Sequence, residues 1–149
     1  MKAVLKRFSF VASGVLSLLA LTACVSALPR CPYIIEDATV CVEPSAWYAL
    51  AGLQLQLANT AAKPLQSCTL VLELCTAEGG ESVWSEPYVI VWEPAVDAND
   101  SALCRLSLDA FFAEAPTEPL VVANVFLRAI RYSDGSRWSD PFGLYASAE

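Results

Sequence analysis

Apolar and polar residues alternate with a period of two through most of the chain after residue 38. In the segment 48–58, Leu53, Leu55 and Leu57 alternate with two glutamines. This pattern is typical of an antiparallel sheet with one face in the core and the other face in water. Further short segments of the same kind follow it. We expect strands at residues 39–42, 48–58, 67–76, 83–92, 102–108 and 120–132, a further strand ending at Asp140, and brief pairing at 144–146.

Three segments refine this outline. Pro87 lies inside the apolar segment 83–92, which predicts an edge strand or a strand in two pieces because proline lacks an amide N–H. Asp109 precedes residues 110–115, which end before a proline, and this predicts a short helix capped by Asp109. Segment 120–132 is apolar on both faces at first, so we expect a central strand.

The dipeptide Asp134-Gly135 suits the two central positions of a type I′ hairpin turn. With these two residues as the whole loop, Arg131 lies directly opposite Trp138 across the hairpin. We therefore predict a cation–π contact between them, which contributes about 0.5–1 kcal/mol at an exposed site.

Some seven short strands with regularly spaced turns and one brief helix predict an all-β antiparallel sandwich. Residues 52–60, followed by Lys63-Pro64-Leu65, resemble a recurrent bacterial extracytoplasmic pattern. In that pattern a strand ends in an Asn turn, a Lys-x-apolar step follows, and a second strand leads to an acidic-Gly turn, here Glu78-Gly79. The resemblance implies an immunoglobulin-like fold. Together with residues 130–136, the chain resembles small spirochaete lipoproteins of unknown function.

The chain begins with the basic residues Lys2, Lys6 and Arg7, followed by the uncharged, mainly apolar run 8–20. This is the layout of an exported signal peptide. An uncleaved single-span anchor is the alternative, because the run without charge continues to residue 28 and a transmembrane helix needs about 20 apolar residues. Serine, threonine and glycine dilute the run, which favours the signal peptide.

The tetrapeptide Leu21-Thr22-Ala23-Cys24 follows the apolar run and resembles the lipobox of bacterial lipoproteins. The resemblance implies cleavage between Ala23 and Cys24, a diacylglycerol on the Cys24 sulfur and acylation of the new amine. Two or three acyl chains anchor stably, since each buried CH₂ contributes about 0.8 kcal/mol. An ordinary secretory signal with a coincidental cysteine is the alternative. We therefore expect a signal peptide at 1–23, a lipidated tether at 24–37 and an immunoglobulin-like β-sandwich at 38–149, on a cell-envelope membrane facing the periplasm or the exterior.

The charge balance excludes one class of partner. Loss of the signal peptide removes three of the nine Lys and Arg residues and none of the 16 acidic ones, so the formal charge falls from −7 to −10. Nucleic-acid binding depends on clustered Lys and Arg, so we expect no nucleic acid as a partner. The membrane, through covalent lipid, and another envelope protein are the expected partners.

Five cysteines remain besides Cys24, and their odd number leaves at least one thiol free or bonded to another chain. Cys31 and Cys41 either close a small loop or are a tether thiol and a strand thiol. Cys68 and Cys104 lie on inward faces of their strands and are either an inter-sheet disulfide or two buried thiols. Cys75 lies on the opposite face from Cys68, so these two should not pair.

Candidate catalytic and metal sites have simpler structural explanations. The chain has no histidine and no CxxC pair, which argues against zinc and excludes Ser-His and Cys-His nucleophiles. Residues 97–100 offer three oxygen donors but lack the fixed glycine and distal glutamate of a calcium loop. Asp134 and Asp140 flank a hairpin and could form a carboxylate pair, but Asp134 is explained by its turn and Asp140 by the proline that follows it. We expect no catalytic residue, metal or cofactor.

Four tryptophans are many for this length (Trp47, Trp84, Trp92 and Trp138). We expect two or three of them in the core, and partial burial of Trp84 and Trp138 at the sandwich edge. The function we expect is a membrane-anchored binding or interaction module and not an enzyme. The alternative is a structural or assembly accessory of the envelope with no ligand of its own.

Overall fold

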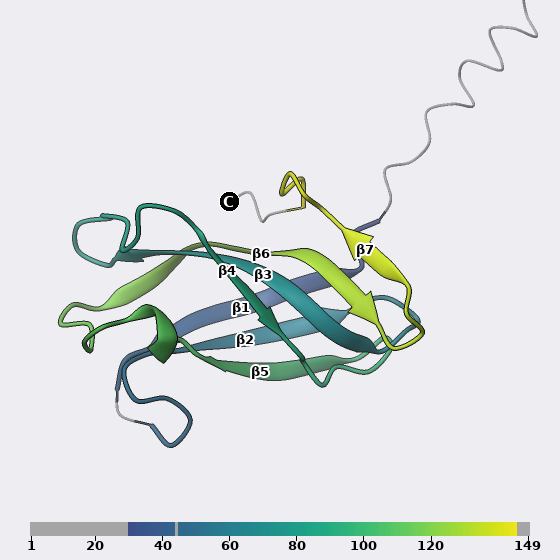
Figure 1. Cartoon of the computed structure of the whole chain (residues 1–149), viewed down its shortest axis with the longest axis horizontal. Helices are drawn as coiled ribbons and strands as arrows, with labels where there is room; N and C mark the ends of the chain where they lie inside the picture. Colours follow the sequence, from purple (N-terminus) through teal and green to yellow (C-terminus); the bar gives the residue numbers. More distant parts are fainter. Residues whose placement is uncertain (1–29, 44, 146–149) are drawn as a thin grey trace, which may run out of the picture. The chain divides into compact units, whose positions relative to one another are not determined.

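The computed structural model describes residues 30–43 and 45–145, and the strands belong to a compact unit that begins at Cys31. Two antiparallel sheets pack face to face, one with strand order β1-β2-β5 and the other with order β4-β3-β6-β7 (Figure 1). The elements are β1 (Tyr33–Cys41), β2 (Gly52–Asn59), β3 (Leu65–Thr76), β4 (Tyr88–Trp92), β5 (Ser101–Ser107), the 3-10 turn η1 (Asp109–Phe111), β6 (Leu120–Tyr132) and β7 (Arg137–Ser139).

The predicted antiparallel β-sandwich is confirmed. Strands β1, β2 and β5 form the smaller sheet. Strands β4, β3, β6 and β7 form the larger sheet, with β4 at one edge. The fourth strand of the chain thus lies at the edge of the larger sheet, next to β3. The two predictions about strand position also hold, since β4 begins directly after Pro87 at an edge and β6 lies between β3 and β7.

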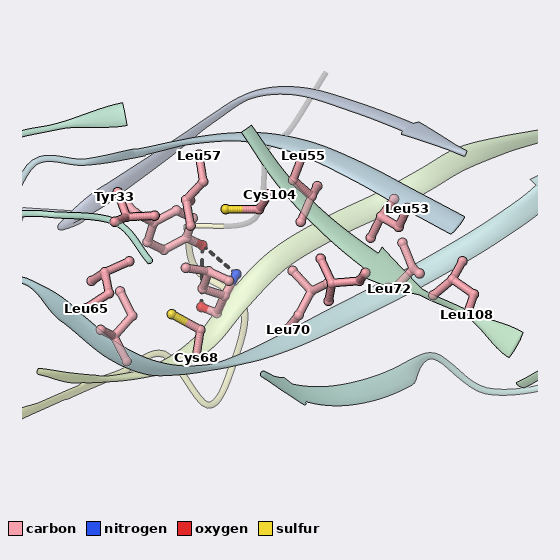
Figure 2. Packing of buried hydrophobic residues seen from close by; sticks show 14 of the residues in the cluster. Tyr33, Leu53, Leu55, Leu57, Leu65, Cys68, Leu70, Leu72, Cys104 and Leu108 are labelled. Carbon is pink, nitrogen blue, oxygen red and sulfur yellow. Dashed lines mark hydrogen bonds between the residues drawn. The ribbon is translucent and has the colours of Figure 1, made fainter. Parts of the chain in front are cut away.

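The core comes from the alternating leucines. Leu53, Leu55 and Leu57 of β2 point across the sandwich at the inward leucines of β3, and all of them are completely or almost completely buried (Figure 2). Each such side chain contributes about 1.5–3 kcal/mol when it leaves water. The glutamines between the leucines of β2 stay half-buried on the outer face, as the period of two predicts.

One polar contact crosses the core between the sheets. The Tyr33 hydroxyl of β1 accepts a hydrogen bond from the Leu127 N–H at 3.0 Å and donates one to the Leu127 carbonyl at 3.4 Å (Figure 2). The register between β3 and β6 shifts at this point: Thr69 pairs with Ala129 and the next residue, Leu70, pairs with Leu127, so Arg128 is left without a partner on β3. Such a β-bulge leaves a ladder position unpaired. The tyrosine satisfies the peptide groups beside it.

The β6–β7 hairpin differs from the prediction. The Tyr132 N–H donates to the Ser136 carbonyl at 3.0 Å, and the Gly135 N–H donates to the Tyr132 carbonyl at 2.9 Å. The loop therefore has three residues, 133–135, and Gly135 ends it with φ +81°. A type I turn followed by a left-handed residue is the usual form of a three-residue hairpin loop. The predicted two-residue type I′ loop is wrong.

The longer loop shifts the hairpin register by one residue, which exchanges the two faces of β7. Arg131 pairs with Arg137, and Ile130 pairs with Trp138. Trp138 turns inward, where its ring meets the Tyr33 ring edge-on with centroids 5.6 Å apart. The predicted cation–π contact between Arg131 and Trp138 is therefore wrong, since the two side chains lie on different faces.

Two element boundaries also differ. β1 begins at Tyr33, before the boundary expected at residue 38, so residues 33–37 belong to the sandwich and not to a tether. The helix expected at 110–115 is a single 3-10 turn, Asp109–Phe111, with no side-chain cap. Asp109 bonds elsewhere, as described below.

The chain enters the sandwich at one end. There, Tyr33 pairs with Asn59, the Thr60 N–H donates to the Pro32 carbonyl, and the Ser133 N–H donates to the Pro64 carbonyl. At the other end of the same strand, Cys41 pairs with Gly52. We call these the entry end and the far end of the sandwich.

Candidate functional site

The predicted lipidation and cleavage residues, Cys24 and Ala23, lie outside the residues that the structure describes. Within residues 30–43 and 45–145, none of the helical segments has the length and apolar character needed to cross a bilayer.

The cysteines of the described residues are all free thiols. A bond between Cys31 and Cys41 is ruled out in this fold. Cys41 is the last residue of the extended strand β1 and Cys31 precedes its first residue, each strand residue rises about 3.3 Å, and a disulfide needs Cα atoms within about 7 Å. Cys75 is half-buried on the outer face of β3 and Cys68 is buried on the inner face, as predicted.

Cys68 and Cys104 point into the core from β3 and β5, in opposite sheets (Figure 2). Burial raises the pKa of the Cys68 thiol to about 12, with a smaller contribution from Cys104, and burial also raises the pKa of Cys104. Thiols of this kind stay protonated and are poor nucleophiles. The structure therefore matches the second interpretation of this pair, two thiols that pack as small apolar side chains.

The acidic residues singled out in the sequence have structural partners. The Asp134 carboxylate accepts a salt bridge from Lys63 at 2.7 Å and a hydrogen bond from the Ser136 N–H at 2.9 Å. Buried Asp140 accepts from the Tyr145 N–H at 2.9 Å. In the loop 97–100, the Asp97 carbonyl accepts a hydrogen bond from Asn59. In the part of the chain that the structure describes, acidic and cysteine side chains nowhere gather in a group able to hold a metal ion.

The four tryptophans are all half-buried, so the expected partial burial of Trp84 and Trp138 is confirmed, while the expectation that two or three tryptophans lie fully in the core is wrong. Trp84 lies in an aromatic cluster at the far end with Tyr88, Phe111 and Phe112, and its ring centroid is 4.0 Å from that of Tyr88. The cluster fills the space where β4 approaches η1.

A hollow lies at the far end, on the outer face of the smaller sheet. Its volume is about 480 Å³, within the range of small-ligand sites. One wall is the segment 45–51, which we call the strap, and we call the cavity the strap hollow. Its lining residues are Val40, Cys41, Val42, Glu43, Ser45, Trp47, Tyr48 and Gln54.

Asp109 holds the strap in place. Its carboxylate accepts hydrogen bonds from three consecutive N–H groups, those of Ala49 at 2.8 Å, Leu50 at 2.6 Å and Ala51 at 3.2 Å. These bonds, those of Leu50 and Ala49 first, lower the pKa of Asp109 to about 2. Asp109 therefore fixes a loop that lies some 60 residues away in the sequence, and the prediction that it caps a helix is wrong.

Aromatic rings close the base of the strap. A Cβ atom on Gly52 would lie 2.4 Å from both the Trp47 and the Tyr48 ring, so only glycine lets the strap pack this closely on β2. On the outer side, the Arg105 guanidinium lies 6.0 Å from the Trp47 ring centroid. The Tyr48 hydroxyl donates to the Glu43 carbonyl. The strap hollow is thus bordered by packed aromatic rings.

The chemistry of the strap hollow suits binding. It combines one aromatic wall (Trp47) with hydrogen-bonding groups from Glu43, Ser45 and Gln54. The chain has no histidine, so the hollow holds no Ser-His or Cys-His pair. The sequence pattern did not predict this site, because it placed residues 48–51 in a strand. In the structure β2 begins only at Gly52, and the preceding residues are held outside the strand by hydrogen bonds to Asp109 and by the packing of two rings on Gly52.

The far end also has a strong charge bias. The loops 43–51, 77–87 and 109–119 contain seven acidic residues and no Lys or Arg. The basic residue Arg105 lies on a strand beside the strap, while Lys63, Arg128, Arg131 and Arg137 lie nearer the entry end of the sandwich. No protein-family model matches the sequence, and no curated protein and no solved structure matches it either.

Proposed function

We propose that the protein is a lipid-anchored extracytoplasmic binding module, tethered through Cys24, that meets a partner through the strap hollow and the loops around it. The anchor rests on the lipobox-like tetrapeptide after a basic and then apolar N-terminus. The observation that carries the binding surface is the position of the strap hollow at the end of β1 opposite to the end where the chain enters.

This arrangement presents the hollow away from the bilayer. A chain from Cys24 to Tyr33 reaches at most about 3.5 Å per residue, or about 30 Å in all. β1 then runs nine residues along the sandwich before the strap begins, which adds about 30 Å. A partner on the outward side therefore meets the far end first, while the tether keeps the entry end near the membrane.

The charge of the far end favours a partner with basic residues. Acidic loops around a site attract cationic surfaces and repel anionic ones, including an anionic bilayer. Interfaces of this kind take their affinity from a few aromatic anchors, and Trp47 is the candidate here. Another envelope protein with a basic patch fits these properties.

Site-specific photo-cross-linking in cells tests the proposal. A photoreactive residue replaces Ser45 in the strap hollow, and, as a matched control, Ser133 at the entry end, both of them exposed serines. We expect a discrete cross-linked partner from position 45, none from position 133, and loss of the product when Cys24→Ser removes the anchor. The same product from both positions, or none from either, would contradict the proposal and favour the structural accessory.

Gly52→Ala is a second test of the proposal, because it changes the shape of the strap hollow without removing any of its polar side chains. The added methyl group displaces Trp47 and Tyr48, so the hollow is distorted while its polar groups remain. We expect the cross-link from position 45 to be lost in a protein whose far-UV circular dichroism is still that of a β-sandwich. An undiminished cross-link would show that the strap is not the contact surface.

A further inference from the structure

A second hollow lies near the entry end, on the outer face of the larger sheet. Its volume is about 440 Å³, and β3, β6 and β7 supply its walls. The register places Ser67, Arg131 and Arg137 side by side in one row across these strands. In the next row, the small side chain of Ala129 lies between Thr69 and Ser139 and leaves room for a ligand. We call this cavity the arginine hollow.

The two arginines are direct neighbours. The Tyr132 N–H bonds to the Ser136 carbonyl and the Asp140 N–H bonds to the Arg128 carbonyl. Because hydrogen-bonded and non-hydrogen-bonded pairs alternate along an antiparallel ladder, Arg131 and Arg137 form a non-hydrogen-bonded pair. In such a pair the Cα atoms are only about 4.5 Å apart and the side chains leave the sheet in the same direction. Two guanidinium groups therefore face the same hollow.

Nothing in the described residues neutralises this pair. Neither guanidinium takes part in a salt bridge or side-chain hydrogen bond among residues 30–43 and 45–145. The nearest hairpin carboxylate, Asp134, is occupied by Lys63 and Ser136. Like charges directly opposite each other destabilise a sheet, and this pair uses two of the few basic residues of an acidic protein. An anion between the guanidinium groups would remove that repulsion.

We propose that the arginine hollow binds a phosphate group. Arginine presents five N–H donors in a planar fork that matches phosphate oxygens, and the hydroxyls of Ser67, Thr69 and Ser139 add donors around the same space. A carboxylate has two acceptor oxygens and uses fewer of these donors than a phosphate, which offers at least three. The inference rests on the hairpin register and the cavity, and it does not depend on the proposed function of the strap hollow.

Two sources of the phosphate group share this chemistry. The arginine hollow is at the end of the sandwich where the chain enters, since the β6–β7 loop bonds to Pro64 and the adjacent loop bonds to Pro32. A tethered protein therefore brings the hollow near lipid headgroups, and a soluble phosphate ester is the other source. The overall negative charge opposes both, so the binding should weaken strongly as salt is added.

The test uses the mature lipoprotein in nanodiscs, and calorimetry measures the binding of inorganic phosphate. In phosphatidylcholine discs we expect saturable binding that weakens at least tenfold in Arg131→Gln/Arg137→Gln and is unchanged in the control Arg105→Gln, on the other sheet. Micelles of a non-ionic detergent without phosphate groups identify the source, because phosphatidylcholine has a headgroup phosphate but no net charge. Weaker apparent binding in the discs than in the micelles means that a headgroup fills the hollow, and equal binding means that a soluble phosphate does.

Stability gives a readout that does not depend on the calorimetry. Because the substitutions remove a like-charge pair, the double variant should unfold at an equal or higher temperature than the wild type without phosphate. Added phosphate should raise the unfolding temperature of the wild type and of Arg105→Gln only. Phosphate binding that is absent in all proteins, or that persists at full strength in the double variant, would overturn the proposal.

Discussion

The Tyr33 hydroxyl and the Leu127 peptide share two hydrogen bonds across the sandwich, with Leu127 N–H donating at 3.0 Å and Tyr33 donating to the carbonyl at 3.4 Å. This contact joins the first strand of one sheet to the bulged central strand of the other. Burial raises the pKa of the Tyr33 phenol, which therefore stays protonated and remains a donor. The sheets are thus fixed relative to each other by a directional bond as well as by leucine packing.

Tyr33→Phe should lower the free energy of unfolding by about 1–3 kcal/mol, because it leaves buried peptide groups without a partner. Urea denaturation measures the change. Tyr88→Phe is the matched control, since the Tyr88 hydroxyl makes no hydrogen bond with any described residue, and it should change stability by less than about 0.5 kcal/mol. Equal effects of the two substitutions would contradict the role of the inter-sheet contact.

Asn59 should be the most sensitive polar residue of the entry end. It is 2% exposed, its amide donates to the Lys63 and Asp97 carbonyls at 2.8 Å, and its side-chain oxygen accepts from the Ala61 N–H at 3.1 Å. Asn59→Ala leaves these groups unpaired and should cost about 3 kcal/mol. Asn124→Ala, on the outer face of β6, should be nearly neutral by the same urea measurement. A small effect at Asn59 would mean that the two loops hold together without it.

Asp109 should make the strap sensitive to acid. Its folded pKa is about 2, below its ordinary value of 3.8, so it stabilises the fold fully above pH 4, and this stabilisation is lost as the pH falls toward 2. Asp109→Asn keeps one acceptor oxygen but replaces the other with an NH₂ group, which points donors at a strap N–H, and it should lower stability at neutral pH and flatten the acid dependence. Thermal unfolding from pH 7 to pH 2 measures both effects. Glu114→Gln, at an exposed loop position, is the control and should leave the acid dependence as in the wild type. Asp134, whose pKa is lowered by Lys63 and Ser136, contributes to the acid dependence of all three proteins alike.

Gly135 should be required because its backbone is left-handed, and not because a side chain at this position would clash with a neighbour. Its φ is +81°, and no neighbouring atom lies within 4 Å of the place that a Cβ atom would occupy there. Gly135→Ala should therefore cost about 1 kcal/mol from conformation alone, while Gly135→Asn should cost less because asparagine tolerates this region. Chemical denaturation compares the two variants. An equal loss would indicate a steric cause and contradict the three-residue loop.

The sequence predicts most of the strands because their cause is local. The alternation of leucine with glutamine in β2 sets its faces, and Pro87 sets the start of the edge strand β4. The β6–β7 register was not predictable in this way, because Asp134-Gly135 is compatible with a two-residue and with a three-residue loop. The difference of one residue in loop length decides whether Trp138 or Arg137 lies opposite Arg131.

The two hollows follow from contacts between distant segments. The strap leaves the expected strand because Asp109 binds its N–H groups and because Gly52 lets two rings pack on β2. The arginine hollow exists only in the observed hairpin register. Neither relationship has a signal in the neighbouring sequence, which explains why the fold was predicted and the sites were not.

The mass of the native protein extracted from its membrane tests the central claim, that a lipid on Cys24 anchors this sandwich. The account predicts a chain that begins at Cys24 and carries a diacylglycerol on that residue, with or without a further acyl chain on its amine. A Cys24→Ser variant should lack the modification. A native chain that retains residues 1–23, or one with an unmodified Cys24 side chain, would contradict the account.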